Sequence, residues 1–349
     1  MVGISLLTLV PGRHGGSETA TSGLLQALAR VGTLEYRVYL PPVAPNAAEG
    51  LASEIVPEYG RATTLPERLG AMAKATVRPG PIRRRLAAAE VLHYPFTIRL
   101  PSTDAPAVVT LHDLQHLDLP ALFSRGERAF RAVAYHRSTR SAARVVVPTE
   151  FVRDHAVRAL RLESERVRVI HHGIDHARFT PSDEPRAPFL LYPARAWPHK
   201  NHVRLFEAFT VLRRERPGLR LVLTGGGHEG RVPEGVEVRG HVDDDELVSL
   251  YRRASALVFP SLYEGFGQPP LEAMACACPV ACSAIPALLE VCGQAARTFD
   301  PDDPAAIASA VRDVLDDPER WRRRGIPQAA RFTWERAAGE YEDVYRELL

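Results

Sequence analysis

The chain has 349 residues, of which 45% are hydrophobic and 25% are charged, and its formal net charge is +2. This length favours two domains over one, and the small net charge excludes the overall basic character of a nucleic-acid-binding protein. No run of about 18 apolar residues occurs, so the sequence predicts no membrane span and favours a cytoplasmic protein.

Short apolar runs alternate with segments of helical periodicity in the first half, the pattern of a parallel sheet with crossover helices. The apolar segment Val2–Val10 is short and lacks a basic start, which indicates a first strand rather than a signal peptide. The predicted strands are Gly3–Val10, Tyr36–Leu40, Val91–Tyr94, Ala107–Leu111, Arg144–Val147 and Val167–Ile170. The predicted helices are Glu18–Arg30, Arg125–Ala142 and Glu150–Leu160.

The second half repeats this alternation after a segment rich in proline and charge, Phe179–Pro188, which is the best candidate for a linker. The predicted strands are Phe189–Pro193, Leu219–Thr224, Val236–Arg239, Ala256–Phe259 and Pro279–Cys282. The predicted helices are His202–Arg216, Asp244–Arg253, Pro269–Ala275, Pro304–Asp316 and Trp334–Leu348. Each half is therefore predicted to be one doubly wound α/β unit.

A glycine-rich turn, Pro11–Ser17, joins the first strand to the first helix, and Gly15 and Gly16 lie within it. Such turns admit a phosphate or another ligand close to the backbone, although a plain tight turn is an equal interpretation. The turn is neither GxGxxG nor a P-loop, so dinucleotide and P-loop functions are disfavoured.

The following region, residues 41–90, is less regular and contains the basic run Arg83–Arg85 with Lys74 and Arg78 nearby. A solvated helix is the default interpretation. Contact with an anionic membrane or a lipid-linked acceptor is the alternative.

His112, with Asp113 and His116 beside it, follows the strand predicted at Ala107–Leu111. A metal site is disfavoured because no third ligand has a defined spacing. A histidine at the carboxyl end of a parallel strand is better interpreted as a hydrogen-bond donor to substrate, and a capped loop histidine is the alternative.

Two cations, Arg195 and Lys200, follow the first strand of the second half. Ligands bind at the carboxyl ends of strands in open α/β sheets, and two fixed cations there suit a diphosphate. Solvated charges at the start of the next helix are the alternative.

Two further turns in the second half bear on a nucleotide. Gly225–Gly227 follows a predicted strand, and Gly240–Val242 precedes the acidic run Asp243–Asp245. The acidic run invites comparison with a metal-binding DxD motif, but its place before Glu246 favours capping of a helix N-terminus.

The most informative segment is Phe259–Ser283, FPSLYEGFGQPPLEAMACACPVACS. It places Glu264 beside the loop Gly265-Phe266-Gly267 and Glu272 eight residues later, in the predicted first turn of a helix. Loop amides that precede a helix suit an anion, and carboxylates suit sugar hydroxyls. Alternatively, Glu272 only complements the helix N-terminus and Glu264 is a solvated loop charge.

This segment resembles the E-x7-E region of the large family-4 retaining glycosyltransferases, written EGFGLPxLEAMAxGxPVxxS, and departs from it at Gln268, Ala277 and Cys278. The segment from Arg195 to Asn201 resembles the GRxxxxKN motif of that family, with Ala194 in place of its glycine. His172–Pro181 resembles its NGVDxxxFxP hinge, with histidine in place of asparagine. The HD pair at His112 resembles members similar to bacterial polysaccharide mannosyl- and rhamnosyltransferases.

The resemblance implies the α/β GT-B fold, in which two Rossmann-like domains face each other across a cleft. We expect residues 1–180 to bind the acceptor and residues 181–330 to bind the nucleotide sugar. Residues 331–349 are expected to form a helix that returns to the first domain.

The resemblance also implies a role for each candidate residue. Arg195 and Lys200 neutralise the diphosphate, and His112 and Glu264 hold the donor sugar with the amides of Gly265, Phe266 and Gly267. Glu272 binds the ribose, and Gly15 and Gly16 lie under the donor phosphate and the acceptor. Val242 belongs to the loop that contacts the base, and Asp244 pairs with guanine in members that use GDP-sugars.

The predicted function is that of a retaining hexosyltransferase that moves a sugar from a nucleotide diphosphate sugar to a glycan, lipid-linked or small-molecule acceptor. No metal cofactor is expected, because protein cations supply the charge stabilisation. The alternatives are an inactive nucleotide-sugar-binding scaffold and a GT-B epimerase or phosphorylase. The four cysteines, Cys276, Cys278, Cys282 and Cys292, are predicted to be small buried residues, because their spacing matches neither a zinc site nor a disulfide framework.

Overall fold

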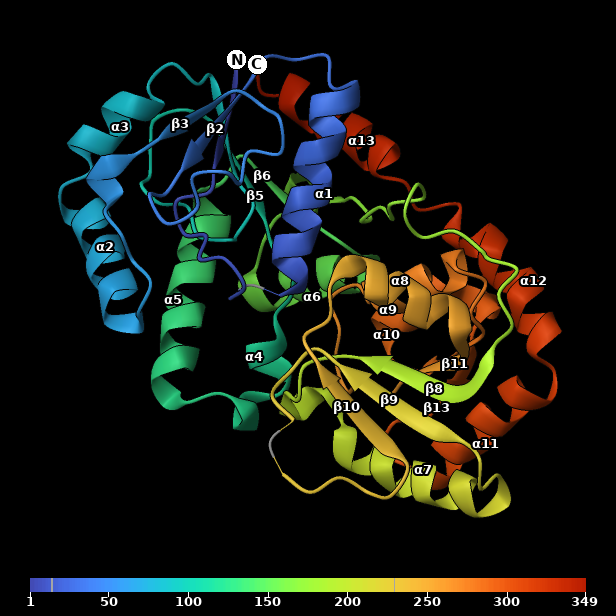
Figure 1. Cartoon of the computed structure of the whole chain (residues 1–349). Coiled ribbons are helices and arrows are strands. Elements are labelled where there is room, and N and C mark those ends of the chain that lie inside the picture. The colour runs from blue at the N-terminus through green and yellow to red at the C-terminus, as the bar shows by residue number, and fades with distance from the viewer. Residues whose placement is uncertain (14, 229) are drawn as a thin grey trace. The chain divides into compact units, whose positions relative to one another are not determined.

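The computed structural model describes residues 1–13, 15–228 and 230–349. The chain forms two compact units (Figure 1). Unit 1 contains Met1–Gly173 and Thr333–Leu349, and unit 2 contains Ile174–Phe332. The chain therefore passes from unit 1 to unit 2 after Gly173, earlier than the boundary placed at residue 180, and its last segment belongs to unit 1.

Unit 1 is built on a parallel sheet that has seven strands among the described residues, in the order β3-β2-β1-β4-β5-β6-β7. Its strands are β1 (Val2–Ser5), β2 (Tyr36–Leu40), β3 (Ser53–Ile55), β4 (Val91–Tyr94), β5 (Ala107–Thr110), β6 (Arg144–Val147) and β7 (Val167–Val169). Its helices are α1 (Gly16–Val31), α2 (Leu65–Val77), α3 (Gly80–Leu86), α4 (Gln115–Asp118), α5 (Arg125–Ser141), α6 (Glu150–Leu160) and α13 (Trp334–Arg346). Short 3-10 turns occupy Pro57–Tyr59, Pro120–Leu122 and Ser164–Arg166.

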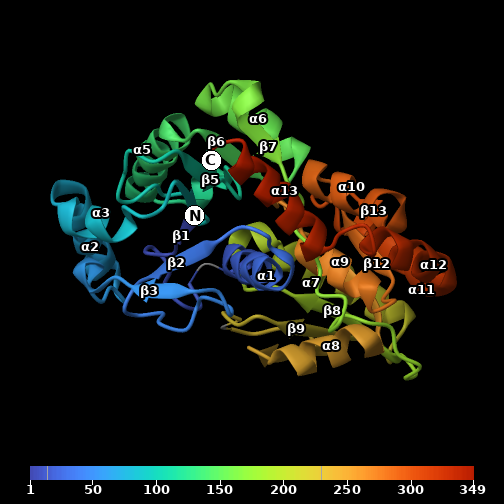
Figure 2. The same ribbon diagram turned by 90° about the horizontal axis from the view of Figure 1, so that it is seen from above.

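Alternate residues of these strands enter two separate cores, because side chains along a strand point to opposite faces. Val38 packs in the core that contains residues of α1 and α13, whereas Tyr39 packs in the core that contains residues of α2, α3 and α6. Figures 1 and 2 show α13 lying alongside α1. Gly23 permits this contact, since a Cβ there would lie 2.3 Å from Cε2 of Trp334.

A buried carboxylate fixes the last helix to unit 1. Glu342 accepts hydrogen bonds from the Thr33 amide at 2.5 Å, the Leu34 amide at 3.0 Å and the Tyr36 hydroxyl at 2.5 Å. Burial opposes ionisation of Glu342, but the hydrogen bonds outweigh it and lower its pKa to about 2. Helix α13 is thus held at the N-terminal end of β2, far from its own neighbours in sequence.

Unit 2 is built on a parallel sheet with the strand order β10-β9-β8-β11-β12-β13 within the described part of the chain. Its strands are β8 (Ala187–Pro193), β9 (Arg220–Thr224), β10 (Val236–Gly240), β11 (Ala254–Phe259), β12 (Val280–Ser283) and β13 (Arg297–Phe299). Its helices are α7 (His202–Glu215), α8 (Asp244–Arg253), α9 (Gln268–Ala275), α10 (Pro286–Cys292), α11 (Pro304–Asp316) and α12 (Pro318–Ala329). Short 3-10 turns occupy Pro198–Lys200 and Gly293–Ala295.

The central strands of unit 2 are apolar runs that are buried on both faces, as parallel sheets require. Leu190, Leu221 and Leu257 are fully buried in one core. All four cysteines are buried free thiols, which confirms the prediction that they are small core residues. Within the described residues, no helix has the length and apolarity needed to cross a bilayer.

Several predicted elements differ from the structure. Strand β1 ends at Ser5 rather than Val10, and the sequence patterns missed α10 and α12 together with the short strands β3 and β13. The basic region, interpreted as a solvated helix without bounds, forms the two helices α2 and α3. The basic run on α3 is partly neutralised, because Arg85 forms ion pairs with Glu58 at 3.0 Å and Glu54 at 3.1 Å.

Candidate functional site

The sheet of unit 2 changes direction between its two central strands. From β8 the chain adds β9 and β10 on one side, and from β11 it adds β12 and β13 on the other. Ligands in open α/β sheets bind outside the carboxyl ends of the strands at such a switch point. The segments that follow β8 and β11 contain Arg195, Lys200 and Glu264.

Lys200 and Glu264 meet at this switch point. Nζ of Lys200 lies 2.6 Å from Oε1 of Glu264, and each side chain is 14% exposed. The Lys200 ammonium also lies 5.3 Å from the centre of the Phe259 ring. The structure thus joins a cation predicted for the diphosphate to a carboxylate predicted for the sugar, which the sequence alone did not indicate.

Asn201 connects the segment after β8 to the segments after β11 and β13, and this role was not predicted. Its backbone is left-handed with φ of 62°, and its side-chain amide donates to the carbonyls of Pro260 at 3.0 Å and Pro301 at 2.8 Å. The Leu262 amide donates to the His199 carbonyl at 2.8 Å. The Lys-Asn pair in the resembled motif was the available signal.

Arg195 is half-buried directly after β8, and its guanidinium carbon lies 5.5 Å from the centre of the Trp197 ring. The turn Gly225–Gly227 supports this segment. Gly225 has φ of 102°, and a Cβ there would lie 2.8 Å from the Arg195 amide nitrogen, so only glycine fits. The turn therefore has a structural role, and its contact with a nucleotide stays a prediction.

The loop Gly265–Gly267 leads directly into α9. Gly267 has φ of 94°, a left-handed conformation that favours glycine, and a Cβ there would lie 2.2 Å from Cδ2 of Leu288 and would displace that side chain. Phe266 is buried edge-on against Phe332, with ring centres 5.9 Å apart. The loop is therefore held in one conformation at the start of a helix, a place that favours an anion.

Glu272 does not lie in the first turn of α9, as predicted, because α9 begins at Gln268 and Glu272 is its fifth residue. Its side chain is 7% exposed and accepts a hydrogen bond from the Tyr251 hydroxyl at 2.8 Å. Burial raises the pKa of Glu272 to about 7, and nearby Asp244 adds to the increase. A solvated charge that complements a helix end would have neither property, so the alternative interpretation of Glu272 is wrong.

Tyr251 was missed, because it lies on α8 and no local pattern connects it to α9. Burial, and next the charge of Glu272, raise the pKa of Tyr251 well above its usual value, so its hydroxyl stays a donor at neutral pH. This bond orients one carboxylate oxygen of Glu272.

The acidic run divides between two roles. Asp243 caps α8 by accepting a hydrogen bond from the Glu246 amide at 2.8 Å, which confirms the predicted cap. Asp244 forms an ion pair with Arg178 and is 68% exposed. Val242 is half-buried in the preceding turn. Contacts of Val242 and Asp244 with a base stay predictions.

In unit 1 the strand order changes direction between β1 and β4. Gly15, with φ of 55°, precedes α1, and Gly16 is the first residue of that helix. A Cβ on Gly16 would meet no described atom within 4 Å. His14, which belongs to the predicted turn, lies outside the described residues. Among the described residues, the space beside Gly16 is therefore open.

His112 follows β5 in unit 1, and its Nε2 lies 2.8 Å from the Pro95 carbonyl oxygen. Since a carbonyl only accepts, Nε2 carries the hydrogen. Burial lowers the pKa of His112, although the bond to Pro95 and the charge of Asp113 oppose this. A neutral ring then offers Nδ1 as an acceptor, so the predicted role as a hydrogen-bond donor to substrate changes to that of an acceptor.

The structure brings Arg195, Lys200, Glu264 and the Gly265–Gly267 loop to one edge of unit 2. Gly15, Gly16 and His112 belong to unit 1. Over residues 1–13, 15–228 and 230–349, no group of three or more His, Cys, Asp or Glu side chains is placed to hold a metal ion.

Two family models match the chain. Residues 14–178 match the model described as Glycosyltransferase Family 4, and residues 175–331 match the model described as Glycosyl transferases group 1. The boundary between the two matches lies close to the passage from unit 1 to unit 2 at Gly173.

Three curated proteins illustrate the similarity. The chain is 31% identical over 276 residues to O-antigen chain mannosyltransferase B of Escherichia coli, covering 71% of this chain and 72% of that protein. It is 31% identical over 277 residues to D-inositol 3-phosphate glycosyltransferase of Streptomyces avermitilis, covering 69% of this chain and 60% of the relative. It is 37% identical over 198 residues to glycogen synthase of Mycobacterium tuberculosis, and this match spans about half of each protein, 51% and 48%.

Solved structures share the fold over almost the entire chain. Sucrose-phosphate synthase from Thermosynechococcus elongatus superposes with a TM-score of 0.79 at 21% identity, covering 99% of this chain and 98% of the other. Anabaena HepE in complex with UDP and glucose superposes with a TM-score of 0.74 at 15% identity, covering 99% of both chains.

Proposed function

Because the chain belongs to glycosyltransferase family 4 and has the GT-B fold, we propose that it is a retaining hexosyltransferase with a nucleotide diphosphate sugar as donor. Unit 2 binds the donor, and unit 1 binds the acceptor. The observation that carries this proposal is the contact of Lys200 with Glu264 at the β8/β11 switch point. The buried Glu272 lies on α9, the helix that follows the Gly265–Gly267 loop.

The diphosphate is the group that the cations of this edge suit. Arg195 offers a planar fork of donors and Lys200 a compact charge, and both follow the same strand. Negative charge develops on the leaving diphosphate as the bond to the sugar breaks, and fixed cations stabilise it. Since these groups are part of the protein, the reaction needs no metal ion.

The carboxylates suit hydroxyl groups instead. Glu264 and the amides of Gly265–Gly267 hold the donor sugar, and Glu272 accepts hydrogen bonds from the ribose. The Tyr251 hydroxyl occupies one side of the Glu272 carboxylate and leaves lone pairs for a ligand. His112 accepts a hydrogen bond from a sugar hydroxyl through Nδ1. Gly15 and Gly16 admit the donor phosphate and the acceptor close to the start of α1.

Retention follows from attack on the face that the diphosphate leaves. The sugar passes through an oxocarbenium-like centre, the acceptor oxygen bonds to the anomeric carbon, and the leaving phosphate oxygen takes the acceptor proton. No side chain of the described site is assigned as a covalent nucleophile. The product is an α- or β-linkage with the same configuration as the donor.

The base of the donor is proposed to be guanine. Support comes from Asp244 beside the turn that ends in Val242, and from relatives whose names state mannosyl transfer. Asp244 is paired with Arg178 in this structure, so a guanine edge would compete with that arginine. Uracil is the competing base.

Release of nucleoside diphosphate from a panel of nucleotide sugars, with and without candidate acceptors, tests the function. Arg195→Ala should lower turnover about a hundredfold, the loss typical of one preorganised donor of charge stabilisation. Arg214→Ala, an exposed arginine on α7, is the matched control and should leave turnover unchanged. Binding of nucleotide sugars without turnover for any acceptor would favour the scaffold, and release of a free epimer or sugar phosphate would favour an epimerase or phosphorylase.

A further inference from the structure

Helices α2 and α5 of unit 1 leave apolar side chains uncovered. On α2, Leu65 is 65% and Leu69 is 47% exposed, and on α5, Phe130 is 39% and Val133 is 69% exposed. The buried residues of α5 are Ser138 and Thr139, both near its C-terminal end. A helix that belongs only to the core of its own domain buries its apolar stripe, so these exposed stripes need another explanation.

Three of these side chains, Leu69, Phe130 and Val133, line one groove between the two helices, which we call the α2–α5 groove. Its volume is about 400 Å³, and its walls include Leu69, Met72, Leu100, Phe130 and Val133. This size lies within the range of about 300–1,000 Å³ that small-molecule sites have. A mainly apolar lining of this extent suits a hydrocarbon chain.

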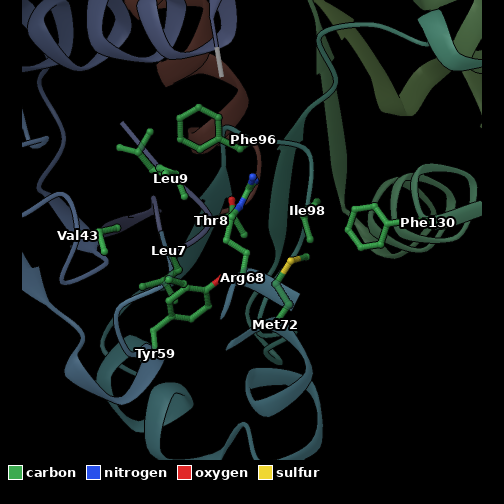
Figure 3. Close-up of a pocket in the computed structure, with 12 residues that line it drawn as sticks. Leu7, Thr8, Leu9, Val43, Tyr59, Arg68, Met72, Phe96, Ile98 and Phe130 are labelled. Carbon is green, nitrogen blue, oxygen red and sulfur yellow. The ribbon is translucent and has the colours of Figure 1, made fainter. Parts of the chain in front are cut away.

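The groove adjoins a second, smaller cavity that reaches the sheet. Met72, Ile98 and Phe130 line both spaces. The smaller cavity, of about 50 Å³, is also lined by Leu7–Val10 after β1 and by Phe96 after β4 (Figure 3). The change in strand direction lies between β1 and β4. A ligand in the groove would therefore extend toward the carboxyl edge of this sheet.

Arg68 supplies a charge within this apolar path. It is half-buried on α2 and extends into the smaller cavity among Thr8, Phe96 and Ile98 (Figure 3). In the described part of the chain, no side chain forms an ion pair with its guanidinium. A guanidinium among mainly apolar walls favours an anionic partner, and phosphate matches its fork geometry.

We propose that the α2–α5 groove binds the hydrocarbon chain of a phosphate-bearing lipid-linked acceptor, with the phosphate against Arg68. The inference rests on the proposed function, because it names the chemical class of the acceptor for unit 1. Exposed cations on the same helices, Lys74 on α2 and Arg137 on α5, complement an anionic amphiphile. A second copy of this chain fits less well, since a symmetric contact would place these like charges together.

Calorimetric titration of decyl phosphate, with decanol and inorganic phosphate as separate probes, tests the proposal. Val133→Asp should weaken the binding of decyl phosphate and of decanol about tenfold or more, because it places a charge in the apolar wall. Arg68→Gln should weaken decyl phosphate by about tenfold and leave decanol unchanged, because only the charge-assisted bond is lost. Inorganic phosphate should bind far more weakly than decyl phosphate.

The control variants carry the same substitutions at positions that do not line the groove. Val203 on α7 of unit 2 is 70% exposed, so Val203→Asp should leave decyl phosphate binding unchanged. Arg128 is exposed on α5 but lines neither space, so Arg128→Gln should also bind normally. Thermal unfolding of each variant checks that it folds.

Three results would overturn the proposal. The first is that the wild-type protein does not bind decyl phosphate, and the second is that inorganic phosphate binds as tightly as decyl phosphate. The third is that Val133→Asp and Val203→Asp bind decyl phosphate with the same affinity. If the protein binds phosphatidylglycerol vesicles but not decyl phosphate, and Val133→Asp does not change the vesicle binding, the protein adsorbs to a membrane surface instead. Nucleoside diphosphate binding measured on the same samples separates the two hypotheses, because it tests the proposed function and does not depend on the groove.

Discussion

Nζ of Lys200 and Oε1 of Glu264 lie 2.6 Å apart, although 64 positions separate the residues in sequence. One follows β8 and the other follows β11, so the strand order alone brings them together. Each side chain is 14% exposed, which means that removal of either partner leaves the other charge poorly solvated. A diphosphate that binds Lys200 would compete with Glu264 for the same ammonium.

The first prediction concerns this pair. Lys200→Met should lower the free energy of unfolding by about 2 kcal/mol, because Glu264 loses its counter-ion in a mostly buried place. The double variant Lys200→Met/Glu264→Gln should recover most of that stability while transfer stays about a hundredfold slower. Urea unfolding and nucleoside diphosphate release measure the two effects. A double variant that is no more stable than Lys200→Met would show that the pair is not coupled.

The second prediction is a pH dependence of stability. The pKa of Glu272 is raised from 4.5 to about 7 in the folded protein, so the folded state binds more protons than the unfolded chain between these values. Stability attributable to Glu272 is therefore present below pH 4.5 and is lost as the pH rises to about 7. Unfolding midpoints of wild type and Glu272→Gln, compared from pH 4.5 to 8, should diverge, with the variant relatively more stable at pH 8.

Nucleotide binding should depend on the same proton. Ribose hydroxyls favour the ionised carboxylate, so affinity for nucleoside diphosphate in wild type should rise as the pH increases toward about 7 and then level off. Glu272→Gln should bind more weakly and lack this dependence. Equal pH profiles for the two proteins in calorimetry would remove Glu272 from ribose binding.

The third prediction separates a functional glycine from a structural one. Gly16→Ala should leave stability unchanged or raise it by about 0.5–1 kcal/mol, because the added methyl group meets open space at the start of α1. Turnover should nevertheless fall about tenfold, because the methyl group occupies space proposed for the phosphate. Gly339→Ala on α13, which also meets no described atom within 4 Å, is the control and should retain full turnover. Full turnover of Gly16→Ala would exclude close approach of the ligand at this position.

The fourth prediction is independence from metal ions. Arg195 and Lys200 supply the positive charge at the proposed diphosphate site, and Asp243 is occupied as a helix cap. Turnover should therefore persist in excess EDTA. Loss of turnover that magnesium or manganese restores would contradict the proposed mechanism.

The fifth prediction concerns the base. Asp244→Asn should weaken GDP about tenfold and leave UDP unchanged, because a carboxylate accepts two hydrogen bonds from guanine and uracil offers only one donor there. This tenfold loss of GDP affinity is at the low end of the effects expected for a charge-assisted hydrogen bond, because Asp244 is 68% exposed. Arg178→Gln removes the competing ion pair and should not weaken GDP. Tighter binding of UDP than of GDP by wild type would reject guanine.

The regular elements near the site were predictable from local patterns. The predicted bounds of the strands Tyr36–Leu40 and Val91–Tyr94 and of the helix Asp244–Arg253 equal the observed ones. The patterns failed where packing outweighs local preference. Helix α12 contains Gly325 and Pro327, and α2 contains Gly70, and these residues disfavour a helix interior in a local prediction.

The sequence by itself determined the two α/β units, the glycines of the Gly265–Gly267 loop and the residue types of the site, because period, turn chemistry and charge are local properties. Only the tertiary structure decided that Lys200 pairs with Glu264, that Tyr251 orients a buried Glu272, and that α2 and α5 form a groove. These relations depend on strand order and on the burial that follows from it, which join residues whose separation in sequence carries no signal.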